Sequence, residues 1–260
     1  MNTNGDHKAP QTDFRQILGI TFFVGSAQRA IDLVCHGGLL VVPAAPALKN
    51  LDQDIAYREA LLNADVAITD SSLMVMVWNF LQGDRIQRLS GLEYLVKLLR
   101  RPDVRGPGES FWVMANRDSA ARNLAWLSEQ GVQVLSEDVY LAPLYGSTIH
   151  DKCLLQRVRE RKPHHIIVTI GGGAQERLGL YLKRNLEWLP AIHCIGAAIA
   201  FLSGDQVHIP MWADRLYLGW LFRCISEPKR YIPRYWSARK LVSLMLRYRS
   251  LPPVVSAKHA

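Results

Sequence analysis

Short apolar runs rich in Ile and Val alternate along most of the chain with longer segments in which apolar residues recur at helical spacing. The runs predict strands at residues 17–24, 39–42, 65–69, 111–115, 132–135, 165–170 and 192–195. The periodic segments predict helices at residues 51–62, 73–81, 92–101, 119–130, 149–161 and 175–189. Strands that alternate with helices predict an α/β fold with a Rossmann-like, mostly parallel sheet flanked by helices.

The alternating pattern stops near residues 203–210, where basic helical segments begin. We therefore expect a polar N-terminal tail at 1–16, an α/β domain at 17–204 and a basic helical appendage at 210–260. The first residues lack the apolar stretch of a signal peptide. The longest apolar run, near 188–203, is interrupted by Pro190 and His193 and is too short to span a bilayer. We expect a protein without an export signal, whose contact with any membrane is peripheral.

The positive charge of the chain is concentrated at its C-terminal end. Residues 215–260 hold ten of the 31 Lys and Arg residues but one of the 23 acidic residues, Glu227. The remaining 21 basic and 22 acidic residues nearly cancel, so the net charge of +8 belongs to this tail. Trp and Tyr residues lie between the cations. This composition favours an anionic partner: phosphates at a membrane surface first, with nucleic acid as an alternative.

The cysteines and histidines give no metal-binding pattern. The four cysteines are scattered without a Cys-x-x-Cys pair, which argues against a zinc ribbon or a disulfide framework and fits a reducing cytoplasm. His164 and His165 are adjacent at the start of a predicted strand, so their side chains should point to opposite faces and cannot readily share an ion. We expect no metal and no cofactor.

Asp70 is the best candidate for a general base. It directly follows the predicted strand at 65–69 and precedes a helix, so its carboxylate should stand at the edge of the sheet where ligands bind. The alternative is that Asp70, or Ser71 beside it, caps the helix beginning near Leu73. From this loop alone we favour the cap. Arg88, in a later loop, could supply a cation to the same edge.

A second candidate loop combines glycines with two polar residues. Gly171, Gly172 and Gly173 permit close approach of a ligand to the backbone, and the following helix offers free N–H groups to a phosphate or a sugar. The dinucleotide fingerprint is absent, because Glu176 stands where its third glycine would be. Gln175 and Glu176 could hydrogen-bond sugar hydroxyls, or Glu176 could simply favour the helix dipole.

Taken together and in order, these segments resemble the WecG/TagA/CpsF family, glycosyltransferase family 26, over roughly residues 39–235. The residues that carry the resemblance are Asn63-Ala64-Asp65-Val66, Asp70, Arg88-Leu89-Ser90-Gly91, Gly171, Gln175-Glu176, Ile195-Gly196-Ala197, Phe201-Leu202-Ser203-Gly204, Pro210, Trp220, Arg223, Glu227-Pro228, Arg230, Arg234 and Tyr235. The sequence departs from the family pattern at Pro43-Ala44-Ala45, Thr69-Asp70-Ser71, Gly173-Ala174 and Ala200, among others, and so loses several polar positions of the donor site.

The resemblance implies an inverting, metal-independent hexosyl- or N-acetylhexosaminyl-transferase. It would move a sugar from a UDP-sugar donor to a polyprenyl-diphosphate-linked acceptor at the cytoplasmic face of the cell membrane, in cell-surface polysaccharide or glycolipid synthesis. Asp70 would deprotonate the acceptor hydroxyl, and arginines would surround the diphosphate. The substrate-binding residues implied are Arg88, Gly171, Gly172, Gln175, Glu176, Gly196, Arg223, Arg230 and Arg234.

Two other functions stay open from the sequence. Ala45, Ser71 and Ala200 stand at usually polar or glycine positions, as expected of a non-catalytic binding or assembly protein that keeps the scaffold. A nucleic-acid binder ranks last because no recognised motif accompanies the basic tail. The tail itself is predicted to be a membrane anchor and an active-site lid. Alternatively, Leu241, Met245 and their neighbours pack on the α/β domain or on another subunit of a homo-oligomer.

Overall fold

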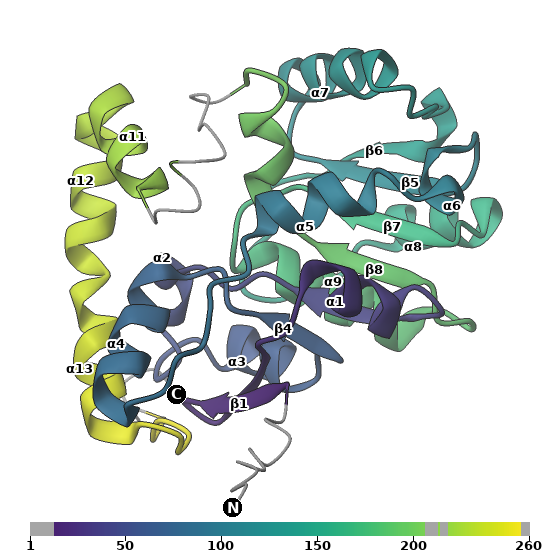
Figure 1. Cartoon of the computed structure of the whole chain (residues 1–260). Helices are drawn as coiled ribbons and strands as arrows, with labels where there is room; N and C mark the ends of the chain where they lie inside the picture. The colour runs from purple at the N-terminus through teal and green to yellow at the C-terminus, as the bar shows by residue number, and fades with distance from the viewer. Residues whose placement is uncertain (1–12, 206–212, 214–217, 256–260) are drawn as a thin grey trace, which may run out of the picture.

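The computed structural model describes residues 13–205, 213 and 218–255, and in this part of the chain eight strands form one sheet (Figure 1). The order across the sheet is β1 (Phe14–Ile17), β2 (Ile20–Phe23), β4 (Val66–Ile68), β3 (Gly38–Val41), β8 (Ala191–Cys194), β7 (His165–Val168), β5 (Ser110–Met114) and β6 (Val139–Leu141). The edge strand β1 pairs antiparallel with β2, and the other pairings are parallel. The predicted α/β fold with a mostly parallel sheet is confirmed.

Helices connect the strands and form the C-terminal segment. Between strands lie α1 (Ala27–Val34), α2 (Ala45–Leu48), α3 (Ile55–Leu62), α4 (Ser72–Gln82), α5 (Gly91–Leu98), α6 (Pro102–Arg105), α7 (Arg117–Glu129), η1 (Ser136–Asp138), α8 (Lys152–Arg161) and α9 (Ala174–Asn185). After β8 follow η2 (Gly196–Phe201), α11 (Gly219–Ser226), α12 (Pro228–Ser237) and α13 (Arg239–Tyr248). The longer helices before β8 mostly begin at a side chain that accepts the N–H three residues on, namely Ser26, Asp54, Ser71, Ser90, Asn116 and Asp151.

Two strand predictions were wrong for local reasons. The run at 17–24 is not one strand but part of the hairpin β1–β2, because Leu18 and Gly19 take positive φ angles of 53° and 78° and reverse the chain. The run at 132–135 is not a strand either. Val132 is buried by packing against the core without pairing, and the edge strand β6 forms later, at Val139–Leu141.

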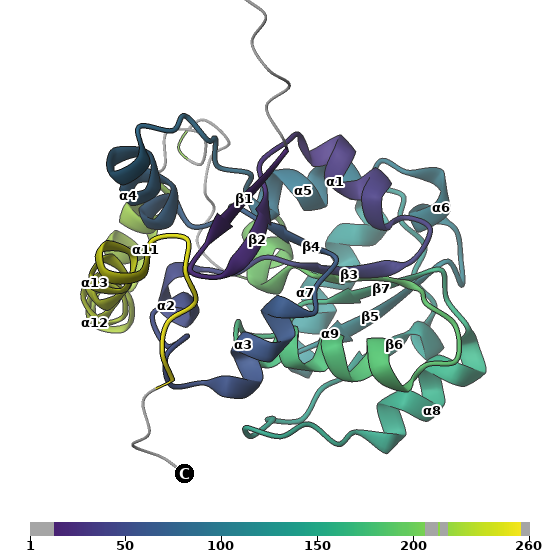
Figure 2. The same ribbon diagram turned by 90° about the horizontal axis from the view of Figure 1, so that it is seen from below.

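The sheet separates two apolar layers because neighbouring residues of each strand point to opposite faces. Leu39 and Val41 of β3 pack in one cluster, which includes residues of α3, α8 and α9. Leu40 packs in the other, which includes residues of α1 and α5. Figure 2 shows α3, α8 and α9 on one side of the sheet and α1 and α5 on the other. Both layers lie beneath the carboxyl ends of the strands and hold the loops that follow them in place.

The last helix belongs to this core. Leu241 and Met245 of α13 are fully buried in the same cluster as β3, so the alternative that they pack on the α/β part is the arrangement found. After α13 the chain returns to the hairpin, where the N–H groups of Leu18 and Gly19 donate to the carbonyls of Arg249 and Ser250 at 2.8 and 2.9 Å. In the described part of the chain, no helix is both long enough and apolar enough to cross a bilayer.

Candidate active site

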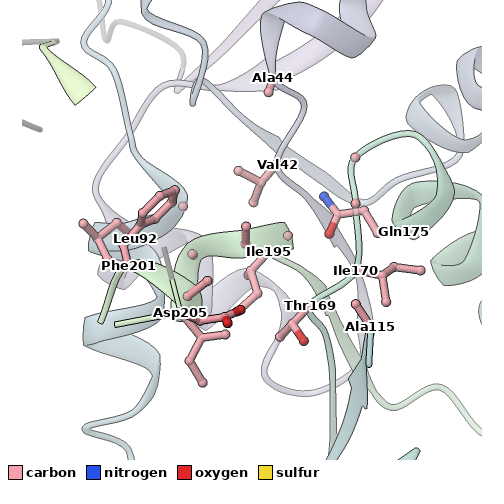
Figure 3. Close-up of a pocket in the computed structure, with 18 of the residues that line it drawn as sticks. Val42, Ala44, Leu92, Ala115, Thr169, Ile170, Gln175, Ile195, Phe201 and Asp205 are labelled. Carbon is pink, nitrogen blue, oxygen red and sulfur yellow. The ribbon is translucent and has the colours of Figure 1, made fainter. Parts of the chain in front are cut away.

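A cavity of about 450 Å³ lies at the carboxyl edge of the sheet (Figure 3). Four strands each contribute the residue that directly follows their last position, namely Val42 after β3, Ala115 after β5, Thr169 after β7 and Ile195 after β8. The strand β4 contributes Asp70, the second residue after its end. Helices α11 and α12 of the tail supply further lining residues. Ligands of open α/β sheets bind at this edge, outside the carboxyl ends of the strands.

Asp70 lies in this cavity and does not cap the helix. The hydroxyl of Ser71 accepts the N–H of Met74 at 3.2 Å and so caps α4. The carboxylate of Asp70 is therefore turned toward the next loop, where its Oδ1 accepts the N–H of Gly91 at 3.0 Å and Nη2 of Arg88 at 3.2 Å. The cap alternative is resolved: Ser71 takes the structural role, and Asp70 keeps a partly exposed carboxylate in the cavity.

Arg88 is held beside Asp70 by its own hydrogen bond and by the hydrogen bonds of Thr69 to the two neighbours of Arg88, Gln87 and Leu89. Its Nε donates to the carbonyl oxygen of Asp70 at 2.6 Å. The hydroxyl of Thr69 donates to the carbonyl of Gln87 at 2.9 Å and accepts the N–H of Leu89 at 3.1 Å. Because Thr69 is fully buried, these bonds fix the loop against β4. A hydrogen-bonded arginine so placed orients the carboxylate and presents positive charge to the cavity.

The glycine loop after β7 brings Gln175 to the cavity together with Gly171 and Gly172. Gly173 has a φ of 92°, and its N–H donates to Oε2 of Glu176 at 2.6 Å. The side-chain amide of Gln175 donates to Oε1 of Glu176 at 3.1 Å. Within the described residues, Oε1 of Gln175 is buried without a hydrogen-bond partner, so this acceptor is available to a ligand donor.

Glu176, which was predicted to bind substrate, lines neither of the two cavities. Its side chain is fully buried and turned back toward Gly173 and Gln175. Burial raises the pKa of Glu176 to about 7, although the hydrogen bond from Gln175 works in the opposite direction. Glu176 therefore acts as a positioning residue for the loop.

Gly196 lies beside the side chain of Gln175 in the lining of the cavity. Its φ is 60°, and a Cβ at this position would stand 3.4 Å from the amide nitrogen of Gln175. Glycine therefore suits this position because of its left-handed backbone, whereas a Cβ would make only an ordinary van der Waals contact with Gln175.

The tail supplies two arginines to the cavity, Arg223 from α11 and Arg234 from α12. The guanidinium of Arg223 lies 4.4 Å above the ring of Phe201, and its Nη1 donates to the hydroxyl of Tyr235 at 3.2 Å. Its Nε is buried without a partner among the described residues. Arg230 belongs to α12, but its side chain lies outside the described part of the structure.

The far end of the cavity is polar, and none of the residues predicted from the sequence lies there. Its lining residues are Asn116, Ser119, Asn123 and Asp205. The carboxylate of Asp205 accepts from the hydroxyl of Ser119 at 2.6 Å and from Nε of Arg122 at 2.7 Å. Burial alone would raise the pKa of Asp205, but these hydrogen bonds outweigh it and lower the pKa. The sequence signal for this end of the cavity was Asn116, a polar residue that directly follows the predicted strand at 111–115.

A second cavity of about 310 Å³ adjoins the first. Asp70, Arg88, Arg223 and Arg234 line both cavities. The second cavity is otherwise mostly apolar, with walls from α4 and from the two tail helices α11 and α12; its remaining lining residues include Pro46, Leu73, Met76, Trp220 and Tyr235. One carboxylate and three arginines therefore stand at the junction of a polar and an apolar cavity.

Three histidines among the described residues, His164, His165 and His193, line neither cavity. His164 is exposed and its Nδ1 lies 2.6 Å from a carboxylate oxygen of Glu109, whereas His165 points inward to Nε2 of His193 at 3.0 Å. Burial lowers the pKa of both His165 and His193. Their opposite directions agree with the predicted strand geometry. In the described part of the chain, no group of three or more His, Cys, Asp or Glu residues could hold a metal ion.

A parallel sheet with a carboxylate and clustered arginines at its carboxyl edge is typical of α/β enzymes that act on phosphorylated substrates. Residues 15–253 match the Glycosyl transferase WecG/TagA/CpsF family, and the chain belongs to it. It is 21% identical over 210 residues to the N-acetylglucosaminyldiphosphoundecaprenol N-acetyl-beta-D-mannosaminyltransferase of Bacillus spizizenii, which covers 77% of this chain and 78% of that protein. The family resemblance found in the sequence is confirmed.

Proposed function

We propose that this protein is an inverting, metal-independent glycosyltransferase that moves a sugar from a UDP-sugar to a polyprenyl-diphosphate-linked acceptor in cell-surface polysaccharide or glycolipid synthesis. The position of Asp70 at the junction of the polar and apolar cavities carries the proposal. The name of the Bacillus spizizenii relative, which describes transfer of an N-acetylhexosamine to a lipid-diphosphate sugar, supports the same chemistry.

The polar cavity suits the nucleotide sugar. Arg223 and Arg234 can neutralise its diphosphate, because guanidinium groups match phosphate oxygens and remain charged at all physiological pH values. The unpartnered Nε of Arg223 is a donor available for this contact. Oε1 of Gln175 can accept a hydroxyl or amide hydrogen from the sugar. The polar end around Asp205 is then left for the nucleoside.

The apolar cavity suits the lipid-linked acceptor. Leu73, Met76 and Trp220 offer apolar walls for the acceptor, while the arginines shared with the first cavity remain near its diphosphate. In this arrangement the acceptor hydroxyl approaches the anomeric carbon from the side of Asp70. That approach is opposite to the leaving UDP, as inversion requires.

The reaction exchanges one bond at the anomeric carbon for another. Asp70 takes the proton of the acceptor hydroxyl as its oxygen forms a bond to the anomeric carbon, and the bond from that carbon to the UDP phosphate breaks with inversion. Arg88 holds the Asp70 carboxylate through Oδ1, so Oδ2 is the oxygen that receives the proton. The tail arginines stabilise the negative charge that develops on UDP.

We further propose that the enzyme works as a peripheral protein at the cytoplasmic face of the membrane, held there by the tail. The described tail carries Trp236, Ile232 and Ile225 with 66%, 53% and 72% exposure. Exposed Lys and Arg residues lie between them. Interfacial helices combine apolar side chains and cations in this way.

Asp70→Asn tests the assignment of the base. Asn can still accept the N–H of Gly91 but binds protons too weakly to act as a base, so turnover should fall by roughly 10²–10⁴ while unfolding is little changed. Turnover is measured by UDP release from a panel of UDP-sugars in the presence of a polyprenyl-diphosphate sugar. Asp118→Asn, at an exposed position of α7, is the matched control. Equal rates for wild type and Asp70→Asn would refute the role of Asp70.

The alternative is a catalytically inactive relative that binds or assembles components of the same pathway. Ala45 and Ala200 favour it, because they line the two cavities at positions where polar donor contacts would otherwise be expected. Calorimetry with UDP-sugars separates the two functions. Binding without turnover under every donor supports the inactive relative, whereas UDP release that depends on the acceptor excludes it.

A further inference from the structure

Helix α4 carries an apolar surface that the α/β fold does not cover. Its sequence, Ser72–Gln82, contains no charged residue. The inner face is buried through Met74, Val75 and Trp78, but Met76 and Phe80 on another face are 50% and 88% exposed. These two residues are four positions apart and therefore lie one above the other on the helix. A helix that is apolar on all sides is normally covered by another structure.

From this surface we infer that α4 inserts its Met76–Phe80 face into an anionic lipid bilayer, beside the tail helices. The inference rests on the proposed function and names a membrane-contacting element outside the basic tail. Helix α13 packs against α4, and Figures 1 and 2 both place α4 beside α12 and α13 on one side of the molecule. The exposed face of α4 thus continues the apolar surface of the tail.

The charge around this surface favours lipid over a second copy of the chain. Arg85 follows α4 and is exposed. On the tail, Lys229 is exposed and the guanidinium of Arg239 lies 4.6 Å above the ring of Trp236. Two copies facing each other would bring these cations together, whereas anionic headgroups would attract them. Aromatic rings with cations beside them are also suited to the headgroup level of a bilayer.

The position of α4 relative to the second cavity gives the contact a function. Met76 is both an exposed residue and a lining residue of that cavity, which it shares with Trp220 of α11. Phe80 lies one helical turn farther from the cavity. A bilayer in contact with Phe80 would therefore reach the entrance between α4 and α11. A lipid-linked diphosphate could then enter the cavity while its hydrocarbon chain stays in the membrane.

Phe80→Glu in the full-length chain tests the inference by flotation with vesicles of phosphatidylcholine and phosphatidylglycerol. Loss of one aromatic side chain from the bilayer and gain of a negative charge should weaken vesicle binding by about tenfold or more. Phe80→Trp should bind as well as wild type. Leu144→Glu is the matched control, because Leu144 is fully exposed and follows β6 at the opposite edge of the sheet. It should float as wild type does.

Flotation requires no turnover, so its outcome is separate from that of the proposed reaction. For an active enzyme, Phe80→Glu should keep its turnover on a short water-soluble acceptor, since Phe80 lines neither cavity. Wild-type flotation of Phe80→Glu, or equal loss in Leu144→Glu, overturns the inference. A wild-type dimer that Phe80→Glu converts to a monomer with unchanged flotation also overturns it, because the face would then join two copies.

Discussion

Replacing Glu176 by Gln should stabilise the protein at alkaline pH. The carboxyl group is fully buried in the glycine loop, and burial raises its pKa from the ordinary 4.5 to about 7. Two neighbours of Glu176, Tyr57 and Cys194, do not stabilise its charged form, because both are buried as well. Burial raises the pKa of each, and the nearby Glu176 carboxylate raises it further. Arg177 on the same helix works in the opposite direction.

The pKa of Glu176 sets both the direction and the size of the effect. Between pH 4.5 and 7 the folded protein retains the proton that the unfolded chain has lost, so the free energy of unfolding decreases as pH rises. Because the unfolded chain releases this proton more readily, the carboxyl lowers the free energy of unfolding by about 1 kcal/mol at pH 5.5 and by about 3 kcal/mol at pH 8. Glu176→Gln has no such cost. If the substituted side chain loses the hydrogen bond from the N–H of Gly173, the stability of the variant falls by a similar amount at both pH values.

Urea unfolding followed by tryptophan fluorescence measures this difference. The stability of Glu176→Gln relative to wild type should increase by about 2 kcal/mol between pH 5.5 and pH 8. Glu129→Gln, an exposed position of α7, is the control and should show no such change. A stability difference that is constant with pH would refute the reasoning, as would a wild type that becomes relatively more stable toward pH 8.

Two further predictions concern the tail and the core. Arg223→Ala should lower turnover strongly while flotation with anionic vesicles changes little, because Arg223 points into the cavity; equal loss of both would show that it acts in docking. Gly179→Ala should destabilise the protein by about 1–3 kcal/mol in urea unfolding. Its Cβ would meet Sγ of Cys194 and Cδ1 of Leu39, both at 2.6 Å, so an unchanged midpoint would contradict this packing.

The strands and helices that could be predicted from the sequence are those marked by a local pattern, an apolar run or a helix cap. Buried strands such as β3 and β7 are continuous apolar runs, and the helices between them begin at recognisable caps. The helix α1 was not predicted, although the sequence carries a cap and an apolar face for it. Ser26 is the cap, and the buried face consists of Ala27, Ala30, Ile31 and Val34. The hairpin was missed because the turn at Leu18 and Gly19 interrupts no apolar pattern.

The site was predictable in part because parallel strands bring their carboxyl ends together. Asp70, Gly171 and Gln175 each follow a strand and do lie in one cavity. The sequence could not distinguish Gln175 from Glu176, since neighbouring residues at a helix start point in different directions. The contributions of Asn123 and Asp205 depend on how α7 packs beside η2, which is a long-range contact with no signature in the sequence.

Helix α12 connects the proposed sugar transfer with the proposed membrane docking, because one of its faces lines the polar cavity and the opposite face is exposed. Tyr231 and Arg234 line the polar cavity, whereas Ile232 and Trp236 are exposed on the outer surface. Arg234 and Trp236 are two residues apart, which is roughly 200° around a helix. If a bilayer holds Trp236, the helix axis is fixed and Arg234 is held over the junction of the cavities. Docking and completion of the diphosphate site are then one event, so weaker docking should raise the KM for a membrane-embedded acceptor before it affects a soluble one.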